Sequence, residues 1–578
     1  MSRIPDSPDL SLLDPILFDR APGGRAQLIP TLFDAQRIYG YVPESVAEAI
    51  GRALRVPLAD IYGVLEFYTM LYSRPTGRTV VRVCTSPLCS RARGEEALEA
   101  AAGHLRVRPG EASADGAWMV EEVPCLGLCD MAPAALVGET PVGAVDPDRP
   151  AAWIEMAHAA ALGRLTGEPR WLTGRVGRSA PDDVEAYRRE GGFVALRRAL
   201  EQMTPSQVIE EIKQSGLVGR GGAAFPTGAK WEMTASAPGP ERFVVCNADE
   251  SEPGTFKDRV LLEGDPLSIL EGMTLAGYAI GARRGYLYVR GEYPRAQAIL
   301  RRALAAASAA GYLGSAILGR DFSFEIELRS GAGAYICGEE TALFESIEGK
   351  RGFPRLKPPY PTTHGLFGAP TVINNVETLA AAAWIIAHGA QTYRSVGTND
   401  SPGSKLFCLS GDVADPGVVE VPYGTTLRRL LELSGGVRGE LQAVLLGGAA
   451  GAFAGPEHLE LPMSFEGLRQ AGLPLGSGVV AVFNRDSDLR ETLQSLARFF
   501  SHESCGKCFP CQLGTQRQLE LVDRIAAGLA SAEDLRTLED VGFTMTNASL
   551  CGLGMTAGSA VLSAIRRWPE LMVGGAGR

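Results

Sequence analysis

The sequence predicts an α/β protein of several domains, with helices at both ends of the chain and strand-containing domains between them. The chain has 578 residues, too many for one hydrophobic core. Its hydrophobic content of 45% and charged content of 21% are those of an ordinary globular protein. Eight of the eleven cysteines fall into two sets of four, one in the N-terminal quarter and one near the C-terminus. In an intracellular chain such sets indicate metal binding or catalysis before disulfides.

Charge and hydropathy exclude two classes of partner. The net charge is −11 and the pI is about 5.3, which argues against nucleic acid and against an anionic membrane surface. The N-terminus has no apolar signal segment, and the most apolar window, Leu379 to Ile386, is too short to span a bilayer. We therefore expect a cytoplasmic protein with no membrane and no nucleic-acid partner.

The N-terminal part is predicted to contain a helical bundle over residues 1–75 and a second domain over residues 76–165. Pro43 stands at a helix entry, and apolar residues then recur at helical spacing as far as Ile50. In the second domain, two strand-like stretches each lead into a cysteine pair. If both pairs lie on loops at the ends of neighbouring strands, four thiolates meet as a [2Fe–2S] cluster requires, with zinc or two disulfides as the alternatives. The cysteines of this set are Cys84, Cys89, Cys125 and Cys129.

Residues 166–195, with scattered Gly, Pro and Arg, are predicted to be a linker before a domain over residues 196–385. That domain opens with a glycine loop, Gly219 to Gly222, which follows a predicted helix. A dinucleotide fingerprint follows a strand, so this loop is not a standard Rossmann turn. Consecutive glycines nevertheless let backbone N–H groups approach phosphate oxygens, whose charge Arg220 and Lys230 would balance. A flexible glycine loop is the alternative.

Two strands of the same domain are followed by polar or glycine-rich segments. The stretch Phe243 to Cys246 runs into Asn247 to Thr255, whose carboxylates and amide can hold ribityl or ribose hydroxyls. A solvated acidic turn is the alternative. The stretch Phe324 to Leu328 is followed by a glycine loop and a helix start over residues 331–343, where a helix N-terminus can face a phosphate or a polar ligand group.

The last third of the chain is predicted to form two domains. Apolar and polar residues alternate between Ser404 and Ala454, with glycine turns and one short helix, which predicts a β-grasp-like domain over residues 400–470. Residues 480–578 are expected to be a helical bundle, because apolar residues between Leu489 and Phe500 fall on one helix face.

The C-terminal bundle carries the second cysteine set. Three cysteines at i, i+3 and i+6 with a distant fourth provide the four thiolates that a [4Fe–4S] cluster requires. Zinc, which usually takes two C-x2-C pairs, is the alternative. The cysteines of this set are Cys505, Cys508, Cys511 and Cys551. The three left over, Cys246, Cys337 and Cys408, are expected to be buried thiols.

Two parts of the chain resemble subunits of NADH:quinone oxidoreductase (complex I). Gly40 to Pro43 and Phe67–Tyr68, followed by the first cysteine set, resemble the 24 kDa thioredoxin-like [2Fe–2S] subunit. Residues 216–378, which end in the segment Thr371 to Thr378, resemble the 51 kDa flavoprotein subunit. That family binds FMN and NAD(H) on a Rossmann-like domain and carries a β-grasp insert. Here the two subunits are fused in one chain.

The resemblance implies specific ligand contacts. FMN contacts are expected from Gly219, Arg220, Gly221, Gly222, Lys230, Asn247, Asp249, Glu250, Tyr335, Gly338, Glu339, Glu340, Asn374, Asn375 and Thr378. NAD contacts are expected from Phe225, Glu252, Lys357 and Tyr360. Two positions depart from the family pattern, because Ala224 stands where glycine is frequent and Met233 where an aromatic residue is frequent.

The redox chemistry implies a function. NAD exchanges two electrons as hydride and an iron–sulfur cluster exchanges one, so a flavin must stand between them. We therefore predict an NAD(H)-linked electron-transfer (diaphorase) subunit with FMN, one [2Fe–2S] cluster and one [4Fe–4S] cluster. No catalytic side chain is expected, because positioning of the redox groups is the catalysis.

The fusion and the lack of a membrane segment favour a soluble complex. The chain most resembles the beta subunit of a soluble molybdenum- or tungsten-dependent formate dehydrogenase, whose alpha subunit, with further iron–sulfur clusters, would be the partner. The diaphorase subunit of a bidirectional NAD-linked hydrogenase and the fused peripheral subunit of a complex I are the alternatives. A scaffold that has lost its cofactors is the hypothesis from a different class.

Overall fold

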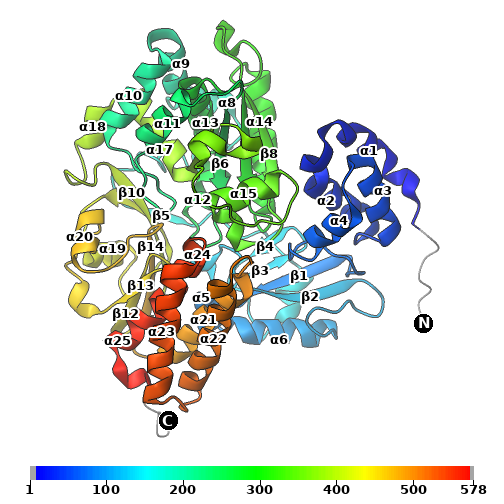
Figure 1. Cartoon of the computed structure of the whole chain (residues 1–578). Helices are drawn as coiled ribbons and strands as arrows, with labels where there is room; N and C mark the ends of the chain where they lie inside the picture. The colour runs from blue at the N-terminus through cyan, green and yellow to red at the C-terminus, as the bar shows by residue number, and fades with distance from the viewer. Residues whose placement is uncertain (1–7, 573–578) are drawn as a thin grey trace.

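The computed structural model describes residues 8–572 and has the α/β multidomain architecture that the sequence predicts (Figure 1). Helices of the N-terminal bundle stand out from the rest of the molecule. Helix α3 begins directly after Pro43 and buries Val46, Ala47, Ile50 and Leu54, the apolar positions at helical spacing. The helices of this bundle are α1 (Asp14–Arg20), α2 (Leu28–Tyr39), α3 (Glu44–Leu54) and α4 (Leu58–Leu65).

The first sheet has four strands in the order β2-β1-β3-β4. Strands β1 and β2 run parallel, with Cys84 beside Val123 at their carboxyl ends, so the two cysteine pairs leave the sheet at the same edge. Its strands are β1 (Thr79–Cys84), β2 (Trp118–Val123), β3 (Ala135–Val137) and β4 (Thr140–Val142). Its helices are α5 (Pro87–Arg91), α6 (Gly94–Leu105) and α7 (Pro150–Ile154).

The second sheet has four parallel strands in the order β8-β7-β6-β9. The chain leaves β6 toward β7 and returns to its other side with β9, and ligands of such sheets bind beyond the carboxyl ends of the strands at this switch point. Asn247 of β6 lies beside Asn375 of β9 there. The strands are β6 (Phe243–Ala248), β7 (Arg284–Val289), β8 (Glu325–Ser330) and β9 (Thr371–Asn375).

Helices surround the second sheet (Figure 1). Helices α13 and α17 pack against β6 and against each other, and nearly all their apolar residues are buried. The helices are α8 (Val184–Arg189), α9 (Val194–Gln202), α10 (Pro205–Ser215), α11 (Thr227–Ser236), α12 (Lys257–Gly264), α13 (Pro266–Ile280), α14 (Pro294–Ala309), α15 (Glu340–Ile347), α16 (Pro361–His364), α17 (Val376–His388) and α18 (Ala390–Arg394).

The third sheet, in the predicted β-grasp-like region, has the order β13-β12-β14-β10-β11-β5. Its edge strand β5 lies at the boundary between the predicted second domain, which ends at residue 165, and the segment predicted to be a linker, which follows it in the chain. That segment is packed rather than free, because the buried Glu420 carboxylate accepts hydrogen bonds from the backbone N–H groups of Trp171, Leu172 and Thr173. The strands are β5 (Arg164–Thr166), β10 (Ser404–Gly411), β11 (Gly417–Pro422), β12 (Leu441–Leu446), β13 (Ala452–Ala454) and β14 (Val479–Asn484), with helices α19 (Leu427–Leu433) and α20 (Phe465–Gln470).

The C-terminal helices form the predicted bundle. Helix α21 buries the predicted apolar face from Leu489 to Phe500, and α25 packs against β13. The helices are α21 (Leu489–Glu503), α22 (Phe509–Ala526), α23 (Ala532–Ala548), α24 (Gly552–Thr556) and α25 (Ser559–Arg567).

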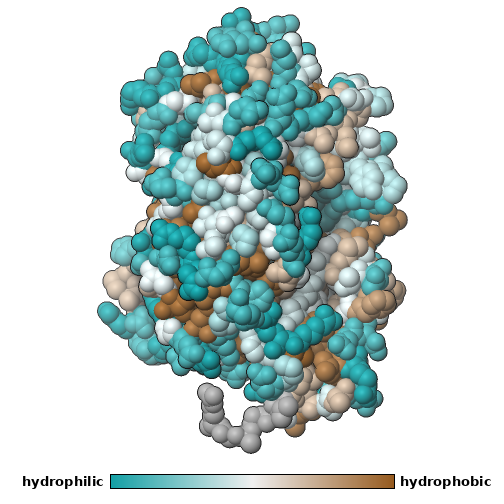
Figure 2. Space-filling view, turned by 90° about the vertical axis from the view of Figure 1, so that its left-hand side faces the viewer, coloured by the Kyte–Doolittle hydropathy of each residue, from teal (hydrophilic) through white to brown (hydrophobic). Residues whose placement is uncertain are grey.

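The surface is mostly hydrophilic on the face shown in Figure 2, with apolar residues gathered in its lower half. Within residues 8–572, none of the helices is both long and apolar enough to cross a membrane.

Candidate functional site

A cavity of about 1170 Å³ lies beyond the carboxyl ends of β6 and β9, where the switch point of the second sheet predicts a ligand. Three parts of the chain form its walls: the second-sheet domain, the loops of the third sheet and the C-terminal bundle. Of the residues implied for FMN, those that line it are Gly221, Gly222, Asn247, Asp249, Glu250, Tyr335, Gly338, Glu339 and Asn375. We refer to it as the flavin cavity.

The glycine loop between α10 and α11 has the geometry that a close ligand requires. Gly222 has a φ of +119°, in the region that favours glycine, and a Cβ there would have only Gly476 and Ser477 nearby, both at 3.9 Å. The space beside this backbone therefore belongs to the cavity and fits a group that approaches the main chain.

The other residues implied for FMN do not line the cavity, and the contacts of several of them lie within the protein around it. Thr378 Oγ1 accepts a hydrogen bond from the Arg220 backbone N–H at 2.9 Å. The Arg220 guanidinium is buried against the Tyr423 ring and donates to the Tyr393 hydroxyl. Asn374 Oδ1 accepts from Trp231 Nε1 at 2.9 Å, and Lys230 Nζ donates to the carbonyl of Ile373 at 3.1 Å. Gly219 and Glu340 are also among the residues implied for FMN that do not line the cavity.

The polar segment after β6 contains a buried oxygen that lacks a partner. Asn247 donates from Nδ2 to the carbonyl of Gly338 at 2.9 Å, which ties the segment to the loop after β8. Asp249 Oδ2 is buried without a hydrogen-bond partner, and burial raises the pKa of this carboxyl well above its usual value. An acceptor left in this state beside the cavity fits a ligand that donates hydroxyl groups, as the ribityl chain of FMN does.

Glu250 is engaged by the protein itself. Its carboxylate accepts from the backbone N–H groups of Asp258 and Arg259, both at 2.9 Å, at the start of α12. Burial raises the pKa of Glu250 to about 7. Its carboxylate therefore positions the start of α12 against this loop.

Sequence analysis missed a pair of charged cavity residues, Lys257 and Asp258. Lys257 Nζ lies 2.7 Å from Asp258 Oδ1 and 3.0 Å from Glu377 Oε2, and all three side chains are buried. Lys405 of β10 joins them, with Nζ 2.7 Å from Glu377 Oε2. In the sequence, Lys257 and Asp258 stand just after the polar segment Asn247 to Thr255, and this position could have identified them as candidate cavity residues.

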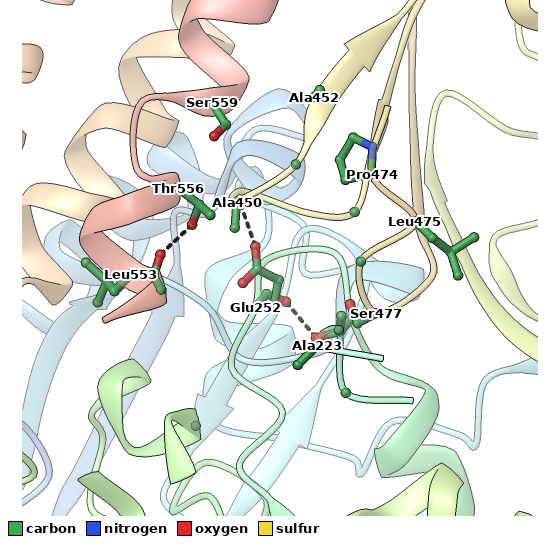
Figure 3. A pocket seen from close by; sticks show the side chains of 18 of the residues that line it. Ala223, Glu252, Ala450, Ala452, Pro474, Leu475, Ser477, Leu553, Thr556 and Ser559 are labelled. Atoms are coloured by element: carbon green, nitrogen blue, oxygen red, sulfur yellow. Dashed lines mark hydrogen bonds between the residues drawn. The ribbon is translucent and has the colours of Figure 1, made fainter. Parts of the chain in front are cut away.

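Glu252, which the resemblance assigns to NAD, lines the cavity where the second-sheet domain meets the loops of the third sheet. Its carboxylate accepts from the Tyr335 hydroxyl at 2.5 Å and from the Ala450 backbone N–H at 2.8 Å, and burial raises its pKa. Figure 3 shows Glu252 between Ala223 and Ala450, with Leu553 and Thr556 of α24 on one side and Pro474 and Leu475 on the other.

The other residues implied for NAD lie outside the cavity wall. The Phe225 ring is 43% exposed and has Lys230 Nζ 5.8 Å from its centre. Lys357 Nζ contacts Glu339 at 2.8 Å and Glu340 at 2.7 Å. Tyr360, which the structure leaves 58% exposed, follows three residues later. An exposed ring beside cations is suited to a nucleotide base and its phosphates.

The N-terminal cysteines form a buried set of thiols without a disulfide. Each is at most 2% exposed, and Cys84 interacts with Cys89 and Cys125, and Cys125 with Cys129. The Gly127 backbone N–H donates to Cys125 Sγ at 3.3 Å. Four buried thiols and a backbone donor to sulfur fit an iron–sulfur cluster. The alternative of two disulfides is wrong.

The C-terminal cysteines surround a pocket of their own, together with Ser504, Lys507 and Leu550. The Leu550 backbone N–H lies 3.5 Å from Cys508 Sγ, and Ser504 Oγ lies 3.2 Å from Cys511 Sγ. Among the residues that the structure describes, no group of three or more His, Cys, Asp or Glu side chains is placed to hold one metal ion. Iron–sulfur clusters take their thiolates on different iron atoms, so they do not need the ligands around one point.

Two residues join the flavin cavity to this pocket. Ile336, in the loop before α15, and Leu553 of α24 line both. Both are buried, so these two apolar side chains border both spaces.

Family models match four regions of the chain. They are the thioredoxin-like [2Fe-2S] ferredoxin over residues 16–158, the Nuo51 FMN-binding domain over 212–384, the SLBB domain over 406–448, and the NADH-ubiquinone oxidoreductase-F iron-sulfur binding region over 491–573.

Two curated relatives show the family. A NADH-quinone oxidoreductase subunit of Aquifex aeolicus is 46% identical over 67% of this chain and 90% of its own. The alpha subunit of the NAD-reducing hydrogenase HoxS of Cupriavidus necator is 37% identical over 96% of this chain and 93% of its own. The chain belongs to this family of FMN- and NADH-binding oxidoreductase subunits. A solved NAD+-reducing [NiFe]-hydrogenase has a chain that matches 94% of this one with a TM-score of 0.84 and 35% identity.

Membership of the family confirms the predicted cofactors and the predicted fusion. The chain is an NAD(H)-linked electron-transfer subunit with an FMN domain, a thioredoxin-like [2Fe–2S] domain and a [4Fe–4S] region. The Aquifex aeolicus relative matches only two thirds of the chain, whereas the HoxS alpha subunit matches almost the whole fused chain. The eight cluster cysteines are present and unpaired, which argues against a scaffold that has lost its cofactors.

Proposed function

We propose that this subunit exchanges electrons between NAD(H) at the flavin cavity and a separate catalytic subunit that docks beside the C-terminal cysteine pocket. The observation that carries the proposal is the shared wall of Ile336 and Leu553, because it gives electrons a short path from cavity to pocket. Bound FMN would convert between the two-electron hydride of NAD(H) and the single electrons of the clusters.

Exposed apolar side chains support docking at this end of the bundle. Phe509 follows Cys508 directly and is 76% exposed, and Leu513, one turn further along α22, is 61% exposed. Phe543 of α23 is also exposed. Large apolar side chains gathered on a surface mark a site for another protein, and Phe509 and Leu513 follow the C-terminal cysteines within the first turns of α22, whereas Phe543 lines the flavin cavity.

Two partners are compatible with this arrangement. A formate dehydrogenase alpha subunit with molybdenum or tungsten is the partner that the sequence predicts, and the fusion of both modules in one chain supports a soluble complex of that kind. A hydrogen-oxidising partner is supported by the match to the HoxS alpha subunit over 96% of this chain.

The decisive experiment co-expresses the chain with each type of catalytic subunit under anaerobic conditions. NAD+ reduction would be measured with formate and, separately, with dihydrogen as the electron donor. Formate-dependent reduction alone assigns the formate dehydrogenase, and hydrogen-dependent reduction alone assigns the hydrogenase. If a complex that contains all its cofactors shows neither activity, both proposed partners are contradicted.

Docking is tested separately with a matched pair of variants. Leu513→Asp places a charge in the proposed contact, whereas Leu529→Asp places one at an equally exposed position beyond the far end of α22. Between Leu513 and the last residue of α22, Ala526, the helix advances by about 20 Å. We expect Leu513→Asp to abolish co-purification of the partner and Leu529→Asp to retain it. Equal retention by both variants would place the partner elsewhere.

A further inference from the structure

Arg290 lies between the flavin cavity and the N-terminal cysteines. It follows β7 directly and is 2% exposed, so its charge is removed from solvent. Its Nη1 donates to the Glu250 carbonyl at 2.6 Å, and its Nη2 donates to the Cys125 carbonyl at 2.7 Å. One guanidinium thus joins the polar loop of the cavity to the loop that carries a cluster ligand.

The contact with Cys125 crosses a domain boundary. Arg290 belongs to the second-sheet domain, and Cys125 follows β2 of the first sheet. The neighbouring Tyr293 contacts both sides of the same domain boundary. Its hydroxyl donates to the Glu250 carboxylate at 3.1 Å, and its ring packs against Gly127. The loop from Cys125 to Gly127 therefore has a fixed place against the flavin-binding domain.

Glu292 forms the salt bridge that balances the charge of Arg290, and the carboxylates of Asp249 and Glu503 also interact with it electrostatically. Glu292 binds it through two oxygens, with Oε1 at 2.9 Å from Nη2 and Oε2 at 3.2 Å from Nε. Arg290 itself contacts the cluster-ligand loop, so the positive end of this ion pair faces the cluster. A second buried arginine at the boundary, Arg259, donates to the Gly127 carbonyl at 3.1 Å, but Asp130 of the same cysteine domain neutralises it at 2.9 Å.

We propose that Arg290 is a positioning residue that raises the reduction potential of the [2Fe–2S] cluster and holds its Cys125 loop against the flavin cavity. Reduction adds one negative charge to a cluster, and a nearby buried cation stabilises the reduced form more than the oxidised form. The potential of this cluster, and with it the share of electrons that it holds, is therefore set partly by a residue of the neighbouring domain.

The test compares Arg290→Met with Arg290→Lys in the full, cofactor-loaded chain. The readout is the midpoint potential of the [2Fe–2S] cluster, from a redox titration followed by electron paramagnetic resonance, with the [4Fe–4S] signal as internal reference. We expect Arg290→Met to shift the [2Fe–2S] midpoint to lower potential and to shift the [4Fe–4S] midpoint less. Arg290→Lys keeps the charge and should retain most of the native potential.

Glu292→Gln makes the test independent of any folding defect at Arg290. It removes the negative partner and leaves the arginine, so we expect the [2Fe–2S] midpoint to move upward, opposite to Arg290→Met. A structural disturbance would not reverse sign between the two variants. An unchanged midpoint in a loaded Arg290→Met protein, equal downward shifts in the Met and Lys variants, or shifts of the same sign in Arg290→Met and Glu292→Gln would each overturn the proposal.

Discussion

Ile336 and Leu553 stand 217 positions apart in the chain and form one wall between the flavin cavity and the C-terminal cysteine pocket. Ile336 comes from the loop that enters α15, and Leu553 from the helix that follows Cys551. Both are apolar and buried. If FMN occupies the cavity and the C-terminal cysteines hold their cluster, as we propose, this wall lies between them.

The first prediction follows from this wall. Leu553→Ala should lower stability by about 2–5 kcal/mol, as large-to-small changes in a core do. It should also raise the midpoint potential of the [4Fe–4S] cluster, because water that enters from the cavity stabilises the more negative reduced form. The measurement is a redox titration of the [4Fe–4S] signal, together with thermal unfolding.

Leu521→Ala is the matched control for the wall. Leu521 is wholly buried in α22 of the same bundle but lines neither space. It should lose comparable stability with no change in potential. An equal shift of the midpoint in both variants would mean that the wall does not control solvent access.

The second prediction concerns the glycine loop. Gly222→Val places a branched side chain at a φ of +119° and in the space beside the loop backbone. We expect the protein to lose FMN while both clusters remain, as measured by flavin and iron content. Gly281→Val is the control, because Gly281 has a φ of +74° at the end of α13 and open space around it. It carries backbone strain of the same kind and should retain FMN.

The spacing of the cysteines in the sequence predicted both sets. The thiols on one loop are close in the chain, and only the end of a strand or helix is needed to bring the separate parts of each set together. It also predicted the polar segment after β6. It did not predict how those polar groups are used. Glu250 appeared available for a ligand, but α12 begins at Lys257 and offers free backbone N–H groups that the carboxylate satisfies.

The parts that sequence reasoning missed depend on contacts between distant segments. The wall of Ile336 and Leu553 exists only after the bundle packs on the second-sheet domain. The boundary between the predicted second domain and the predicted linker forms strand β5, which pairs with the edge of β11, and Glu420 binds the linker backbone that follows. No local pattern indicates such pairings, since each requires knowledge of which domains meet.

The third prediction tests the residues assigned to NAD by resemblance. Phe225→Ala should weaken NADH binding about 5- to 150-fold, corresponding to the roughly 1–3 kcal/mol that an aromatic contributes by stacking on a base. FMN content should not change, because Phe225 does not line the flavin cavity. Phe225→Tyr retains the ring and should retain the affinity. The measurement is an NADH titration of diaphorase activity with a small acceptor, and an unchanged value for Phe225→Ala combined with a weakened Tyr360→Ala would move the base onto Tyr360.

The fourth prediction concerns the buried charges that join the third sheet to the flavin domain. Glu377 binds two lysines, Lys257 at 3.0 Å and Lys405 at 2.7 Å. Glu377→Gln leaves both cations buried without their shared partner, and we expect a loss of about 3–5 kcal/mol in unfolding free energy. Lys405→Met should cost less, because Glu377 keeps its contact with Lys257. Denaturant unfolding of both variants checks the order, and a larger loss in Lys405→Met would contradict it.

The last prediction separates the roles of the two clusters. The C-terminal cysteines share a wall with the flavin cavity, whereas none of the N-terminal cysteines lines it. Cys508→Ser should therefore abolish electron transfer between NAD(H) and the partner's substrate, yet spare NADH oxidation by a small acceptor that takes electrons at the flavin. Cys125→Ser should retain much of the coupled activity, because the N-terminal cluster lies off the direct path. Both activities would be measured for each variant, with iron and flavin content as controls, because loss of a thiolate ligand can unfold a small metal-stabilised domain. If a folded Cys125→Ser protein with its flavin and its [4Fe–4S] cluster loses coupled turnover as completely as Cys508→Ser, the N-terminal cluster is on the main path, and the shared wall of Ile336 and Leu553 does not define the route.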